Sequence, residues 1–97
     1  MRQITKESIN AFMNRQEFRK QNMKVSTLKN KWYLELHNNI IAVLHPDNTL
    51  MVSNCGWKSN TTKERLNALP NVSIVQRDFI WYLNGEKWNG ELTEIKQ

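Results

Sequence analysis

Residues 31–54 read KWYLELHNNIIAVLHPDNTLMVSN and contain the clearest strand pattern in the chain. In KWYLELH, apolar side chains alternate with polar or amphipathic ones, as in a strand with one buried face. IIAVLH is almost continuously apolar, which is typical of a central strand, and TLMVSN follows as the next strand. The connections at Asn38-Asn39 and at residues 46–48 are short, so they predict antiparallel neighbours.

Helices are predicted on both sides of this region. The first spans about Lys6–Arg19, with Thr5 as its N-cap and an apolar stripe along one face. The second spans about Thr62–Leu69, where Thr61 and Glu64 have the spacing of a capping box. Each helix therefore has one apolar face that must be buried against another element.

Further strands complete the fold. MKVSTL gives a weak strand signal before residue 31, and VSIVQR and FIWYLN turn near Arg77-Asp78. Asn84-Gly85 is typical of a type I′ hairpin, and the tail ELTEIKQ forms a short edge strand or frays. The sequence predicts an α+β fold: an antiparallel sheet of about five to six strands, with the N-terminal helix and the short second helix packed on one face. Ninety-seven residues suffice for a single domain, 1–97.

Composition limits the compartment and the chemistry. With one cysteine, Cys55, the chain has no internal disulfide and no cysteine-based zinc site. The N-terminus lacks the apolar region of a signal peptide, and no apolar run approaches the roughly 20 residues of a membrane span. We therefore expect a cytoplasmic protein that does not contact membranes.

Catalytic constellations are not evident in the sequence. A nucleophilic pair would need Cys55 close to His45, and the predicted hairpin places them near opposite strand ends. Three glycines are too few for a phosphate-binding loop, and metal ligands at useful spacing are absent. We expect no enzymatic activity, no metal and no cofactor.

The net charge is concentrated in residues 15–31, RQEFRKQNMKVSTLKNK, which we call the basic segment. Six of its side chains are basic and one is acidic, so its formal charge of +5 equals that of the whole protein. Cations interleaved with amides and hydroxyls are typical of phosphate recognition. The alternative is a solvated helix end followed by lysines that protect an edge strand from aggregation. The predicted phosphate-binding residues are Arg15, Arg19, Lys20, Lys24, Lys29 and Lys31.

Two further positions extend the hypothesis. Tyr33 is expected on the sheet face opposite Trp32, where it either stacks on an unpaired base or caps the core with its hydroxyl in water. A secondary anion site is predicted at the start of the second helix, where Lys58 and Lys63 flank the cap Thr61. Self-capping by Thr61 is the alternative interpretation of that segment.

The second half of the chain resembles a known group of proteins. GWKSNTTKERLNALPNVSI followed by WYLNGEKWNG, within residues 53–90, is similar to a pattern in small accessory proteins of tailed bacteriophages. INAFMNRQEF near the N-terminus adds weaker support. The resemblance implies a viral protein in the host cytoplasm that is not an enzyme and that binds host machinery or nucleic acid, sometimes to block a defence system.

These features lead to two functional hypotheses. In the first, the basic segment binds RNA or DNA, with RNA favoured, and this binding counters a host defence nuclease or toxin. In the second, the protein is an inhibitor that docks on an acidic surface of a host enzyme without binding nucleic acid. An edge strand would also allow a homodimer.

Overall fold

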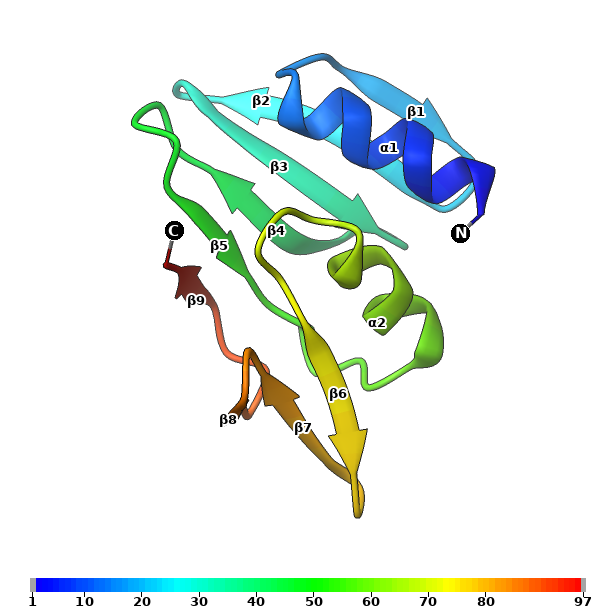
Figure 1. Ribbon diagram of the computed structural model, residues 1–97. Coiled ribbons are helices and arrows are strands. Elements are labelled where there is room, and N and C mark those ends of the chain that lie inside the picture. The colour runs from blue at the N-terminus through cyan, green and yellow to red at the C-terminus, as the bar shows by residue number, and fades with distance from the viewer. Residues whose placement is uncertain (1, 97) are drawn as a thin grey trace.

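Five consecutive strands follow the first helix and form most of the larger sheet. The computed structural model describes residues 2–96 (Figure 1). The strands of this sheet are β1 (Phe18–Lys20), β2 (Met23–Leu28), β3 (Lys31–Leu36), β4 (Asn39–Leu44), β5 (Leu50–Val52) and β9 (Thr93–Ile95). All neighbours are antiparallel, in the order β1-β2-β3-β4-β5-β9. The predicted α+β fold is confirmed, and the tail forms an edge strand, one of the two states predicted for it.

A second, smaller sheet contains β6 (Ile74–Arg77), β7 (Ile80–Leu83) and β8 (Glu86–Lys87). The expectation of one continuous sheet is therefore wrong. In Figure 1 the β6–β7 hairpin projects from the body at the end opposite β1 and β2. Trp81 and Trp88 anchor it, because both are buried and their ring centroids lie 6.3 Å apart.

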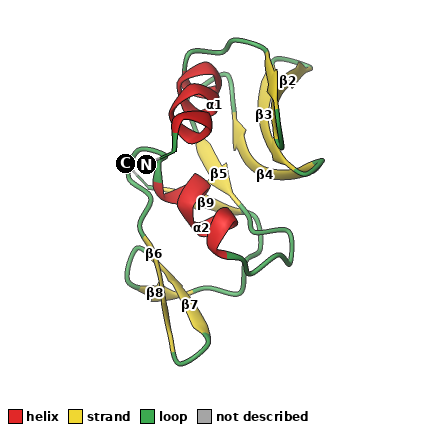
Figure 2. Ribbon diagram, turned by 90° about the vertical axis from the view of Figure 1, so that its right-hand side faces the viewer, coloured by secondary structure: helices red, strands yellow, loops and turns green. Residues whose placement is uncertain are grey.

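Both helices, α1 (Gln3–Met13) and α2 (Asn60–Asn67), pack on the same face of the larger sheet (Figure 2). Phe12 of α1 and Leu66 of α2 are fully buried against strand residues such as Leu34. The opposite face of β1–β4 is not covered by a helix (Figure 2). This asymmetry decides which strand side chains are available to a ligand.

The first helix is shorter than predicted and begins earlier. It ends at Met13 because Arg15 adopts a φ of 53°, and the Gln16 and Arg15 amides donate to the carbonyls of Ala11 and Phe12. That double hydrogen bond is a Schellman motif, which glycine usually forms at the position of Arg15. The missing glycine explains why the end was not foreseen.

Thr5 is not the N-cap of α1. It is buried inside the helix, where its hydroxyl donates to Glu64 Oε1 at 2.6 Å. The cap position belongs to Arg2, which makes no side-chain capping bond. Thr5 therefore connects α1 to α2 and does not cap the start of α1.

Two tight turns lie one residue away from their predicted positions. His37-Asn38, not Asn38-Asn39, joins β3 to β4, and Asp78-Phe79, not Arg77-Asp78, joins β6 to β7. All four of these turn residues have positive φ, as a type I′ turn requires. Sequence preference alone gives little weight to histidine or phenylalanine at such positions, so the register was assigned incorrectly.

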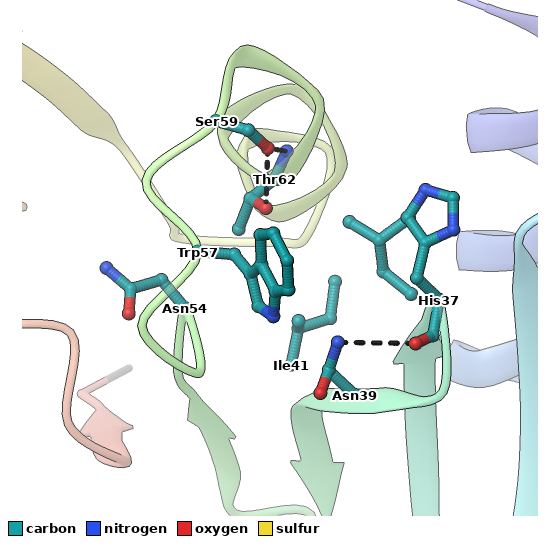
Figure 3. Close-up of a pocket in the computed structure, with 8 residues that line it drawn as sticks. His37, Asn39, Ile41, Asn54, Trp57, Ser59 and Thr62 are labelled. Carbon is teal, nitrogen blue, oxygen red and sulfur yellow. Dashed lines mark hydrogen bonds between the residues drawn. The ribbon is translucent and has the colours of Figure 1, made fainter.

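The second helix is capped by Ser59. Its Oγ accepts from the Thr62 amide at 3.1 Å, and the hydroxyls of the two residues lie 3.0 Å apart (Figure 3). The predicted cap, Thr61, is inside the helix. Glu64 faces Thr5 and Arg65 rather than the cap, so the predicted capping box is not formed.

We expect Ser59→Ala to lower the free energy of unfolding by about 1 kcal/mol, the usual loss when an N-cap oxygen is removed. Thr61→Ala is the matched control and should change it by much less. Urea denaturation followed by circular dichroism measures both. Equal losses in the two variants would contradict the assignment of Ser59 as the cap.

Candidate nucleic-acid interface

The helix-free face of β1–β3 collects part of the basic segment. Strand register places Lys24 between Arg19 on β1 and Glu35 on β3. Two pairs further along, on the same face, Ser26 is opposite Tyr33, and the last pair joins Leu28 to Lys31. The alternating residues Met23, Val25, Leu34 and Leu36 are buried on the other face. The expected position of Tyr33 opposite the core is therefore confirmed, and its side chain is half-buried.

Arg19 and Lys24 also line a polar hollow of about 240 Å³ at one end of these strands. Gln21, His37 and Asn38 also contribute to its wall. No carboxylate is among its lining residues within the described part of the chain. Cations with neutral hydrogen-bond donors around an open hollow can hold a phosphate group. His37 was missed by sequence reasoning, since only the turn geometry brings it beside the basic segment.

Two of the six predicted cations have partners within the protein. Lys20 Nζ lies 2.9 Å from Glu7 Oε1, and this hydrogen bond holds the pKa of Glu7 below its usual value. Arg15 donates to the His45 carbonyl at 3.2 Å and to Asn48 Oδ1 at 2.7 Å. These contacts attach α1 to β1 and to the β4–β5 turn, so neither cation lies on the helix-free face.

The remaining four cations have no ion pair. Within residues 2–96, no carboxylate lies within ion-pair distance of Arg19, Lys24, Lys29 or Lys31. Lys29 is exposed in the turn between β2 and β3, next to Lys31. Glu35 is the acidic side chain of this face, and the Ser26 hydroxyl donates to its Oε2 at 3.1 Å. The face therefore has two pairs of free cations, one at each end. Glu35 lies beside Lys24 at one end, and Tyr33 lies between the two ends.

The predicted secondary anion site is divided. Lys63 donates to Gln76 Oε1 at 2.9 Å and lies 5.8 Å from the centre of the Trp81 ring, so it points toward β6 and β7. Lys58 lines a different groove, beside Phe79 and Lys87. With Ser59 occupying the Thr62 amide, the geometry does not gather Lys58, Thr61 and Lys63 around one anion.

A small apolar cavity lies beside this helix end. Trp57 lies between the Ser59–Thr62 pair of α2 and the His37–Asn39 turn (Figure 3). The volume of this cavity, about 80 Å³, is smaller than the roughly 300–1,000 Å³ of typical small-molecule sites. A cavity of this size beside the exposed Trp57 cannot hold a nucleotide.

The candidate nucleophile and base make unrelated contacts. Cys55 is exposed and its thiol donates to the Ile40 carbonyl at 2.6 Å, whereas His45 Nε2 lies 3.4 Å from Met51 Sδ. Across residues 2–96, no group of three or more histidine, cysteine or acidic side chains is arranged to hold a metal ion. Over the same residues, no helix is both long and apolar enough to cross a bilayer.

Comparison with known proteins gives one match. The model of the Kyanoviridae Gp96 protein family matches residues 1–94, which is nearly the entire chain. No curated protein and no solved structure matches it. The match includes the segments that resemble phage accessory proteins and also the basic segment. The chain therefore belongs to the Kyanoviridae Gp96 protein family, a family of bacteriophage proteins.

Proposed function

We propose that this phage protein binds single-stranded nucleic acid, RNA in preference to DNA, on the helix-free face of β1–β3. The observation that carries the proposal is the shared face of Arg19, Lys24 and Lys31, with Tyr33 between the two ends. Cations at both ends can contact the phosphates of one strand, and an aromatic ring between them can stack on an unpaired base. In the host cell such binding would counter an RNA-directed defence nuclease or toxin.

The preference for RNA rests on the neutral donors beside the cations. Gln21 and Asn38 line the hollow that contains Arg19 and Lys24, and Ser26 adjoins Tyr33. Amides and hydroxyls at these positions can hydrogen-bond a ribose 2′-OH, which DNA lacks. Single strands fit better than duplexes because only unpaired bases offer their faces for stacking.

The test is a salt titration of binding to a short labelled single-stranded RNA and to DNA of the same sequence, measured by fluorescence anisotropy. The double variant Arg19→Gln/Lys24→Gln should reduce the slope of log K against log salt by about two, one for each lost phosphate contact. Affinity at low salt should fall with it, because the same contacts supply most of the attraction.

Lys6→Gln/Lys96→Gln is the matched control, because both lysines are exposed and lie outside this face. It removes the same charge and should leave the slope nearly unchanged. Glu35→Gln removes the acidic group of the face and should strengthen binding. The proposal is wrong if Lys6→Gln/Lys96→Gln changes the slope as much as Arg19→Gln/Lys24→Gln does. It is also wrong if binding by the wild type does not depend on salt.

A further inference from the structure

The tip of the β6–β7 hairpin has an unusual residue. Phe79 is 89% exposed and occupies the second turn position with a φ of 67°. Asparagine or glycine is favoured there, since the left-handed region is unfavourable for a bulky side chain. Neither fold stability nor solubility accounts for an exposed phenylalanine in that conformation. Strained, exposed apolar residues of this kind are found at binding sites.

The hairpin face behind this residue has a consistent character. Register places Val75 opposite Tyr82 and Arg77 opposite Ile80, while Tyr82 also pairs with Lys87. Val75 is 46% exposed, and the Arg77 guanidinium lies 4.9 Å from the centre of the Tyr82 ring. Aromatic and arginine side chains dominate the energetic centres of protein interfaces.

A groove beside this face adds charge. It has a volume of about 490 Å³ and is lined by Phe79, Ile80 and both hairpin tryptophans, with Lys58 and Lys87 at its sides. Of its lining residues in the described chain, none is a carboxylate. A groove with a mixed polar and apolar lining and a lysine at each side complements an apolar side chain whose neighbours are acidic.

We propose that the β6–β7 hairpin docks an acidic segment of a partner protein, whose apolar side chain contacts Phe79 and Ile80 while its carboxylates meet Lys58 and Lys87. A protein is favoured over nucleic acid because Val75 and Ile80 add aliphatic surface to the exposed ring of Phe79, and a mixed aliphatic and aromatic surface suits an apolar side chain. This surface lies at the end of the molecule opposite β1 and β2 (Figure 1), so it is independent of the proposed nucleic-acid interface. Both surfaces together would let the protein connect a nucleic acid to an acidic protein.

The test uses a pool of synthetic acidic peptides that each contain one Phe, Tyr, Trp or Leu, added to the ¹⁵N-labelled full chain. Peptide binding should shift the backbone amide signals of Val75, Phe79, Ile80 and Lys87 and leave those of Arg19 and Lys24 in place. Peptides with amides in place of the carboxylates should bind at least about tenfold more weakly. If no acidic peptide shifts the hairpin signals at millimolar concentration, or if single-stranded RNA shifts them instead, the proposal is overturned.

Phe79→Asn separates binding from folding. Asparagine suits the turn better, so the variant should unfold about 4 °C higher while its affinity for the peptide falls about tenfold or more. Lys58→Gln/Lys87→Gln should weaken peptide binding, whereas Lys6→Gln/Lys96→Gln should not. Undiminished binding by Phe79→Asn contradicts the docking role, and that result would leave the salt dependence of RNA binding unaffected.

Discussion

Replacing Gly90 by alanine is expected to destabilise the protein by roughly 3 kcal/mol, more than the same change at Gly56 or Gly85. Gly90 has a φ of 91°, and a Cβ there would overlap the side-chain amide of Asn54. Asn54 is only 1% exposed and its Oδ1 accepts from the Gly56 amide at 2.8 Å. Moving this side chain away from Gly90 would therefore break its hydrogen bond to Gly56.

Gly90 also joins the two sheets. The Gly90 carbonyl accepts from the backbone N–H of Asn54 at 3.1 Å and from the Ser53 hydroxyl at 2.9 Å. These bonds connect the segment after β8 to the end of β5, just before β9 pairs with β5. A shift of the backbone at Gly90 would therefore disturb the C-terminal edge of the larger sheet as well as the Asn54 pocket.

Gly85→Ala is the matched control for this variant. Gly85 has nearly the same φ, 89°, but a Cβ there would meet nothing within 4 Å. Gly85→Ala should lower the free energy of unfolding by only about 1 kcal/mol, the cost of placing a residue with a Cβ at positive φ. Thermal denaturation should place Gly90→Ala roughly 15 °C below the wild type, since 1 kcal/mol shifts the Tm of a domain this size by about 4–8 °C. Equal shifts in the two variants would show that the overlap with Asn54 has no cost.

Replacing Arg65 by methionine is expected to cost roughly 2–4 kcal/mol, because it breaks the polar contact that joins both helices to the sheet. Arg65 is 1% exposed, and its Nη1 donates to Thr5 Oγ1 at 2.7 Å and to Glu64 Oε1. Its Nη2 donates to Asn22 Oδ1 at 3.3 Å, in the turn between β1 and β2. Methionine keeps most of the buried volume, so the loss reports mainly on these hydrogen bonds.

A double-mutant cycle with Thr5→Val measures the contact directly. Urea denaturation of the wild type, the two single variants and the double variant should give a coupling energy of about 1 kcal/mol or more. Additive losses would mean that Arg65 and Thr5 stabilise the protein independently, which would contradict the contact.

The pH dependence of stability provides a second readout of the same cluster. Burial raises the pKa of Glu64, but hydrogen bonds from Thr5 and Arg65 outweigh it and hold the pKa below its usual value. A carboxyl with a depressed pKa in the folded state stabilises above its unfolded pKa, and that stability is lost as the pH falls through the folded value. The wild type should therefore lose more stability on acidification than Arg65→Met does.

Much of the fold was predictable because its signals are local. The alternation in KWYLELH and the apolar run IIAVLH predict the strands that became β3 and β4. Asn84-Gly85 is the turn residue pair that joins β7 to β8. By contrast, β1 was missed, since Phe18–Lys20 continues the composition of the preceding helix and the αL residue that separates them is Arg15.

The candidate interface was predictable only in part. That Tyr33 lies opposite the core follows from the two-residue period of a strand. The strand period does not predict that Lys20 pairs with Glu7 or that Arg15 reaches the β4–β5 turn. Both contacts depend on how α1 packs across the sheet. His37 and Phe79 were likewise not recognised, because each obtained its exposed position from a turn whose register was one residue off.

The sequence by itself determined the fold class, the two helices, most of the strands and the concentration of positive charge in residues 15–31. These follow from hydrophobic periodicity, turn residues and composition, which act between neighbours along the chain. Only the tertiary structure decided that β6–β8 form a separate sheet, that Ser59 caps α2, and which four of the six cations remain free. Those outcomes depend on contacts between distant segments, because the face that a helix covers decides which side chains are left to meet a ligand.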